Sequence, residues 1–219
     1  MSSDEKDLTK RYTLGEEIFN SVSHGVGVFF AVAGCAVLIV LSAIYADHWA
    51  VISSVIYGIS MFCLYLASTL YHSFQNKKIK EILRVFDHCT IFLLIAGTYT
   101  PFTLFTLRAS VGWFLFAVIW INAIVGIILN AINLKKYEKI SLLLYLVMGW
   151  AVVFAVKPLI AVVSILTLVL LIAGGLMYTF GVIFYCMTKY KYMHSIWHLF
   201  VLAGTILHYF AILFNIIGM

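Results

Sequence analysis

Long apolar stretches separated by short polar connections constrain the fold of this chain more than any other feature. Each stretch approaches or exceeds the roughly 20 helical residues needed to cross a hydrocarbon core of about 30 Å. A backbone in lipid must satisfy its polar groups internally, which favours helices over open strands. We therefore predict an all-α bundle of seven transmembrane helices, at about Phe19–Tyr45, Trp49–Ser73, Leu83–Phe105, Gly112–Ala131, Ile140–Val156, Leu159–Tyr185 and Tyr192–Ile217.

Composition agrees with this assignment and leaves little chain for anything else. Of the 219 residues, 64% are hydrophobic and 11% are charged, whereas a soluble domain carries about 25% charged residues. We expect one transmembrane domain over residues 19–219, preceded by a cytoplasmic segment of residues 1–18. The net charge of +5 does not indicate a nucleic-acid partner, because the basic residues lie in short connections between apolar segments.

The basic residues predict the orientation of the chain in the membrane. Of the 14 lysines and arginines, only Arg108 and Lys157 fall on one side of the predicted bundle; the other twelve fall on the opposite side. Basic connections remain in the cytoplasm, so we expect the N-terminus inside and the C-terminus outside, in a plasma (inner) membrane. Lys157-Pro158 is interpreted as a tight turn between the fifth and sixth spans. One continuous helix there would leave six spans and disrupt the alternation.

This topology brings polar side chains from four predicted helices to one depth, near the inner leaflet. They lie in the last turns of the second span and at the start of the first, third and seventh, and many recur at a spacing of four residues, which places them on one helix face. Polar groups at membrane depth are costly and usually have a function. The set is Glu16, Asn20, His24, Ser68, His72, Asp87, His194 and His198.

Three of the histidines predict a metal site. His72, His194 and His198 offer imidazoles, which suit Zn²⁺, and three protein ligands leave a fourth position for water, as in catalytic zinc sites. Zinc lowers the pKa of such a water to about 7. Asp87, the one carboxylate well inside an apolar span, is the candidate general base. Ser68 is expected to hold the water or to polarise a substrate carbonyl.

Other polar residues receive different interpretations. Glu16, Asn20 and His24 are expected around the ligands or at the mouth of the site. His208 lies ten residues beyond His198, about 15 Å along a helix, so it cannot reach the same ion and is interpreted as a polar packing or transport-path residue. His48 is expected at the membrane interface.

Two sequence features outside the polar set indicate local helix structure. Pro101 is expected to kink the third span. Gly174, Gly175 and Gly181 in the sixth span are expected to allow close helix approach.

At these residues the chain resembles the haemolysin III family, the bacterial branch of the progestin and adiponectin receptor family. The resemblance implies a seven-helix fold in a bacterial plasma membrane with the N-terminus inside, zinc held by His72, His194 and His198, and Asp87 contacting zinc through water. The wider superfamily includes alkaline ceramidases, which hydrolyse a lipid amide bond. The matching pieces are Glu16-x-x-x-Asn20-x-x-x-His24, Ser68-Thr69-Leu70-Tyr71-His72 followed by Asp87, Gly97-Thr98-Tyr99-Thr100-Pro101, and His194-Ser195-Ile196-Trp197-His198.

Two functions of different classes follow. The first is a zinc-dependent hydrolase that uses water to cleave a lipid amide or ester entering from the inner leaflet. The second is a non-enzymatic channel, pore-forming protein or regulator of membrane lipid and energy homeostasis. A pore needs a polar stripe across the full bilayer, and the outer halves of the predicted helices offer few polar residues, namely Ser60, Asn122 and His208.

Overall fold

The computed structural model describes residues 12–218, and within them it is helical without strands. The elements are α1 (Leu14–Tyr45), α2 (His48–Ser73), α3 (Lys77–Pro101), a π-helical turn (Phe102–Thr106), α4 (Gly112–Gly149), a 3₁₀ turn (Ala151–Ala155), α5 (Val156–Ile160), α6 (Ile165–Cys186) and α7 (Met193–Ile217). Six helical stretches of the described chain are long and apolar enough to cross a membrane. The all-helical, multi-pass architecture is therefore confirmed.

Helix α1 begins at Leu14, five residues before the predicted start of the first span. Thr13 caps it: the Thr13 hydroxyl accepts from the backbone N–H of Glu16, and the Glu16 carboxylate accepts from the backbone N–H of Thr13. Acidic residues are favoured in the first turn, where the helix dipole is positive. The earlier start matters because it makes Glu16 and Glu17 part of the helix.

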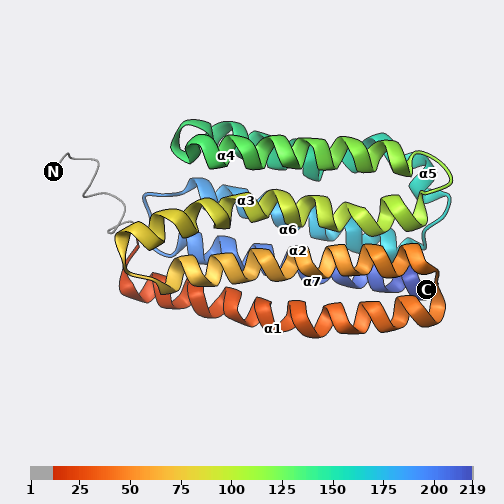
Figure 1. Ribbon diagram of the computed structural model, residues 1–219, viewed down its shortest axis with the longest axis horizontal. Coiled ribbons are helices and arrows are strands. Elements are labelled where there is room, and N and C mark those ends of the chain that lie inside the picture. Colours follow the sequence, from red (N-terminus) through yellow and green to blue (C-terminus); the bar gives the residue numbers. More distant parts are fainter. Residues whose placement is uncertain (1–11, 219) are drawn as a thin grey trace.

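The predicted fourth and fifth spans form one element, α4, with a break at Asn133. Asn133 has non-helical dihedrals (φ −161°, ψ 91°), and its side chain accepts from the backbone N–H of Lys136, as an N-cap residue does. The Ser141 hydroxyl donates to Asn130 Oδ1 at 2.5 Å. Residues 11 apart on a straight helix lie about 16 Å apart, so the chain reverses direction at Asn133, as Figure 1 also shows.

The turn predicted at Lys157-Pro158 is wrong in position. Both residues lie inside the short helix α5, and the chain turns instead at residues 161–164. Proline is tolerated there because it occupies the first helical turn, where backbone N–H groups have no partner within the helix. Pro101 ends α3, and the chain continues from it as the π-helical turn.

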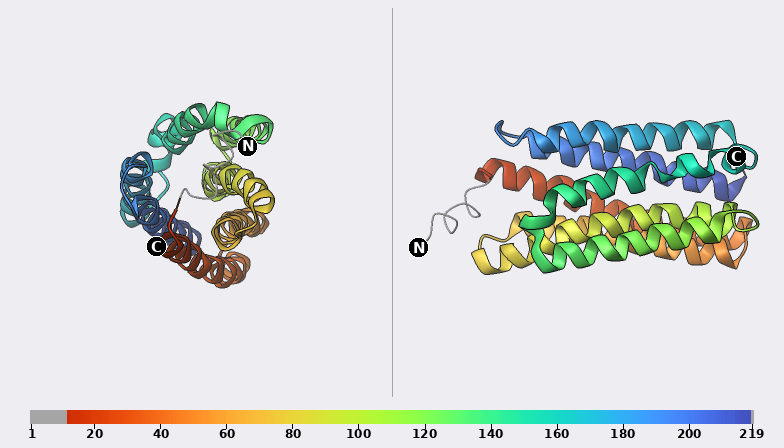
Figure 2. Two further views of the ribbon diagram at one scale, coloured as in Figure 1. Left: turned by 90° about the vertical axis from the view of Figure 1, so that its left-hand side faces the viewer. Right: turned by 90° about the horizontal axis from the view of Figure 1, so that it is seen from above.

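The helices follow one another around a ring that closes between the first and the last. Helix α1 packs against α2 and α7, α2 against α3, α3 against α4, and α6 against α7, and the end-on view in Figure 2 shows this order. The first turns of α1, α3 and α7 and the reversal in α4 share one end of the bundle (Figure 1). At that end Arg84 lies 3.8 Å from Glu138, whereas Arg108 pairs with Asp47 at the opposite end.

Candidate metal centre

The ring arrangement brings His72 from the last turns of α2 next to His194 and His198 in the first turns of α7. The three imidazoles offer ligand nitrogens that lie within 4.8 Å of one another. His72 and His198 are each 1% exposed, and the Nε2 atoms of His194 and His198 are 3.1 Å apart. The predicted histidine cluster is therefore present, and it could hold a metal ion.

The hydrogen bonds of two of these rings fit a metal site. His72 Nδ1 lies 2.6 Å from Glu17 Oε2, and His198 Nδ1 lies 3.3 Å from the carbonyl oxygen of Asn20. Both partners accept only, so each Nδ1 carries the proton and each Nε2 bears the lone pair that a metal requires. Two nitrogens bound tetrahedrally at 2.0–2.1 Å would lie about 3.4 Å apart, close to the observed separation of the α7 pair.

Glu17, absent from the sequence prediction, is the residue that orients His72. Its other oxygen, Oε1, lies 2.8 Å from the ammonium group of Lys80, and the Glu17 side chain is 8% exposed. A carboxylate hydrogen-bonded to the far nitrogen of a ligating histidine fixes the ring and increases its basicity. The sequence contains a signal for this role of Glu17. Its spacing of three residues from Asn20, and of a further four to His24, places all three on one face of α1.

Asn20 connects the same face of α1 to α7. It is fully buried; its side-chain oxygen accepts from the Ser195 hydroxyl at 2.6 Å, and its backbone carbonyl accepts from His198. Both bonds fix the rotation of α7 about its axis. Ser195 was not predicted, although it lies between the two α7 histidines.

His24 stacks on His198, with ring centroids 3.7 Å apart and an interplanar angle of 12°. The His24 ring also makes an edge-to-face contact with the ring of Tyr65. Both ring nitrogens of His24 are buried and have no hydrogen-bond partner within residues 12–218. The structure thus places His24 beside a histidine of the cluster, held there by ring packing.

Glu16 has a different position from Asn20 and His24. Its carboxylate accepts from Thr13 and, at 2.7 Å, from the backbone N–H of Tyr192. Tyr192 adopts a left-handed conformation (φ 62°) immediately before α7. Glu16 therefore ties the start of α1 to the start of α7, and it positions His194 through the backbone.

Tyr12 lies across the histidine cluster at its polar end. The Tyr12 ring stacks on His194, with centroids 4.9 Å apart, and approaches His72 at 5.5 Å. The residue was not considered in the sequence prediction because it precedes the first apolar segment. It covers one side of the cluster, while the other side meets the interior of the bundle.

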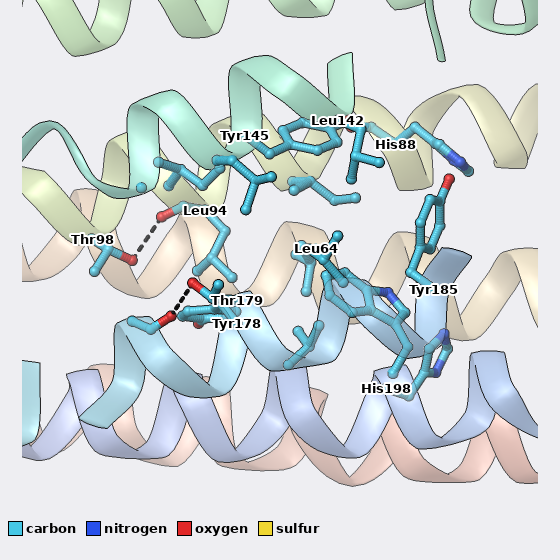
Figure 3. A pocket seen from close by; sticks show the side chains of 18 of the residues that line it. Leu64, His88, Leu94, Thr98, Leu142, Tyr145, Tyr178, Thr179, Tyr185 and His198 are labelled. Atoms are coloured by element: carbon cyan, nitrogen blue, oxygen red, sulfur yellow. Dashed lines mark hydrogen bonds between the residues drawn. The ribbon is translucent and has the colours of Figure 1, made fainter. Parts of the chain in front are cut away.

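That interior contains a cavity of about 120 Å³ which runs from the cluster along the bundle. Asp87 of α3 and Ser68 of α2 line it together with His194 and His198. Most other lining residues are apolar. Figure 3 shows His88, Tyr185 and His198 at one end of this cavity and Thr98, Tyr178 and Thr179 toward the other.

The remaining histidines do not belong to the three-histidine group. His48 is the first residue of α2, beside Trp49. His88 Nδ1 donates to the carbonyl oxygen of Arg84, and its own carbonyl accepts from Tyr145. His208 donates from Nε2 to the carbonyl oxygen of Leu171 and lines the cavity; no ligand nitrogen of His208 belongs to the three-histidine group.

Removal of the Glu17 charge is expected to weaken metal binding. Glu17→Gln keeps the shape of the side chain but loses the anion that His72 and Lys80 contact. We expect the affinity for Zn²⁺ to fall by about 10- to 100-fold, measured by competition with a chromophoric chelator. Glu81→Gln, an exposed change on α3, is the matched control. Native affinity in Glu17→Gln would show that the carboxylate does not support a ligand.

Comparison with known proteins places the chain among haemolysin-like membrane proteins. The family model described as "Haemolysin-III related" matches residues 12–209. The chain is 43% identical to the "Hemolysin-3 homolog" of Bacillus subtilis (strain 168) over 203 residues, which cover 93% of this chain and 95% of that protein. It is 43% identical to "Hemolysin-3" of Bacillus cereus over 92% of each chain. It is also 33% identical to the human "Monocyte to macrophage differentiation factor", over 91% of this chain and 84% of that protein.

Proposed function

The chain belongs to the haemolysin III family, and from that premise we propose that it is a zinc-dependent hydrolase of a lipid amide or ester bond in the bacterial plasma membrane. The observation that carries the proposal is the position of the histidine cluster. Three imidazoles meet, two of them line a largely apolar cavity, and a carboxylate (Asp87) and a hydroxyl (Ser68) line the same cavity. That combination suits a long apolar substrate with one polar, hydrolysable bond.

The two arms of α4 on either side of Asn133 are proposed to cross the membrane separately, which gives seven crossings with the N-terminus in the cytoplasm. The reversal at Asn133 supports this topology. The basic residues beside the reversal, Lys135 and Lys136, then lie on the same side as the start of α3. The histidine cluster would lie near the cytoplasmic leaflet.

His72, His194 and His198 would hold the zinc ion. When bound, Zn²⁺ acts as a Lewis acid and makes water a nucleophile near neutral pH. Glu17 and Asn20 hold the rings of His72 and His198 in the required tautomer through the Nδ1 bonds described above. The protein's part is therefore to hold the Nε2 lone pairs of His72 and His198 available before the metal arrives.

Asp87 is the proposed general acid and base. It lines the cavity together with two of the histidines and is 8% exposed, so it can accept the proton released by the attacking water and then transfer it to the leaving amine or alcohol. Ser68, which lines the same cavity, would orient that carboxylate or donate to the substrate carbonyl. The apolar walls of the cavity would hold the acyl chain and exclude bulk water.

Gly175 offers a direct test of whether the cavity holds the substrate. A Cβ atom added at Gly175 would meet no atom within 4 Å, and the residue lines the cavity. We expect Gly175→Leu to fold and to bind zinc normally but to release fatty acid from a lipid amide or ester at a rate lower by about tenfold or more. The rate is measured with purified protein in vesicles of defined lipid composition.

Gly175→Ala is the control at the same position, because one methyl group leaves most of the cavity open. It is expected to keep native turnover. Absence of fatty-acid release from the native, zinc-loaded protein with both lipid classes would exclude the hydrolase proposal, whereas native turnover in Gly175→Leu would exclude this cavity as the substrate site.

The names of the two Bacillus relatives favour a second candidate, membrane permeabilisation. Ion flux through planar bilayers that contain the purified chain would support it. The two functions differ in their dependence on Asp87: hydrolysis needs its proton transfer, and permeation does not.

A further inference from the structure

The end of the cavity remote from the histidine cluster contains a polar group that the proposed hydrolysis does not use. His208 of α7 lines this end. It lies ten residues beyond His198, about 15 Å along the helix. Its neighbours are Tyr178, whose ring centroid lies 5.4 Å from that of His208, and Gly174, whose lack of a side chain makes room for the imidazole.

The tautomer of His208 follows from its one hydrogen bond. Nε2 lies 3.1 Å from the carbonyl oxygen of Leu171. A carbonyl oxygen can only accept, so Nε2 carries the hydrogen, and in the neutral ring Nδ1 has a lone pair. Nδ1 is buried and has no hydrogen-bond partner within residues 12–218. A buried acceptor without a donor is destabilising, which points to a donor supplied from outside the chain.

The other polar groups at this end also accept. The Thr98 hydroxyl donates to the carbonyl oxygen of Leu94 at 2.7 Å, and the Thr179 hydroxyl donates to the carbonyl oxygen of Gly175 at 2.8 Å. Both hydrogens are engaged within their own helices, and the Thr179 oxygen already accepts from the indole N–H of Trp150 at 3.0 Å. The Thr98 oxygen is therefore the hydroxyl oxygen that can face a ligand as an acceptor. Figure 3 shows both hydrogen bonds at the end of the cavity away from His198. The complementary ligand group is a hydrogen-bond donor without charge.

We propose that His208 forms a second polar subsite, which binds a hydroxyl group carried on the acyl chain of the ligand. The proposal rests on the proposed function for the placement of the carbonyl or carboxyl end at the metal. The apolar residues that line the cavity, among them Leu64, Leu94 and Val182, would hold the methylene chain. The site would thus select long-chain hydroxyacyl lipids by the distance between carbonyl and hydroxyl.

The test compares dodecanoate with 12-hydroxydodecanoate as ligands of the purified, zinc-loaded full chain, by isothermal titration calorimetry. We expect the hydroxylated acid to bind about three- to tenfold more tightly. In His208→Phe, which removes the acceptor, we expect the preference to vanish or reverse while dodecanoate itself still binds. His208→Asn, which returns a carbonyl oxygen near the place of Nδ1, is expected to recover part of the preference.

A chain-length series on the native protein provides a measurement that needs no variant. At each chain length, the affinity of the acid with a terminal hydroxyl is compared with that of the unsubstituted acid. The gain in affinity should be largest near twelve carbons and small for chains as short as octanoate or as long as hexadecanoate. Equal or weaker binding of the hydroxylated acid at every length, or a preference that survives His208→Phe, would overturn the proposal and leave water as the partner of Nδ1.

Failure of the metal hypothesis would have a different signature. If chelation of zinc left the affinity for dodecanoate unchanged, the carboxylate would not be bound at the metal and the proposed function would fail. The ratio of the affinities for 12-hydroxydodecanoate and dodecanoate, and the loss of this preference in His208→Phe, would still report on the His208 subsite.

Discussion

Replacement of His194 by alanine is expected to abolish stoichiometric zinc binding. His194 Nε2 lies 3.1 Å from His198 Nε2, and the third imidazole, His72, completes the group. Residues that merely support a ligand contribute 10- to 100-fold to metal affinity, so loss of a ligand itself should weaken binding by more than about 100-fold. Metal analysis of the purified protein should show close to one zinc per native chain and almost none in His194→Ala.

His48→Ala is the matched control, because His48 begins α2 beside Trp49 and is not part of the cluster. It should retain the native zinc content. His194→Gln tests whether the loss reflects the ligand or the packing of Tyr12 and Tyr185 against the imidazole, since the amide occupies similar space. A native metal content in both His194 variants would refute the assignment of the cluster as a metal site.

Asp87→Asn is expected to stop lipid hydrolysis while leaving zinc in place. The amide has nearly the same shape as the carboxylate but cannot accept the proton of the attacking water. Proton transfer by a positioned side chain contributes about 10²- to 10⁴-fold to rate, and we expect a loss of turnover in that range. The measurement is fatty-acid release in defined vesicles, with the zinc content of the same preparation determined in parallel.

Glu81, another carboxylate of α3, supplies the control for Asp87, because Glu81 is exposed and does not line the cavity. Glu81→Gln should hydrolyse lipid at the native rate. Full activity in Asp87→Asn would remove Asp87 from the mechanism. Unchanged ion flux in Asp87→Asn, together with no hydrolysis by the native chain, would favour the permeabilisation alternative.

Much of the fold could be predicted from local patterns. The apolar segments located most helix ends to within a few residues, as for α2 and α7, because lipid demands continuous apolar helix. The first helix starts earlier than predicted, because the capping box of Thr13 and Glu16 begins the helix before the apolar segment does. The break before α6 was placed at Pro158, although proline is compatible with the first turn of α5.

Only two of the three glycines of α6 that were predicted to allow close helix packing face another helix. Gly181 faces Trp197 and Phe200 of α7, and Gly174 faces His208, so close helix packing is confirmed for both. Gly175, the adjacent residue, faces open space and lines the cavity. Three glycines of one helix serve two purposes, and the difference depends on which face of α6 meets α7.

What the sequence alone determined is the helical membrane architecture and the spacing of polar residues along each helix, because helix periodicity and the length of an apolar segment are local properties. What only the tertiary structure decided is which helices are neighbours. The ring places α1 beside both α2 and α7, so that Glu17 reaches His72, Asn20 reaches Ser195 and His24 stacks on His198. These partners are 55 to 175 residues apart in the chain, and their contact depends on helix packing, which no local pattern specifies.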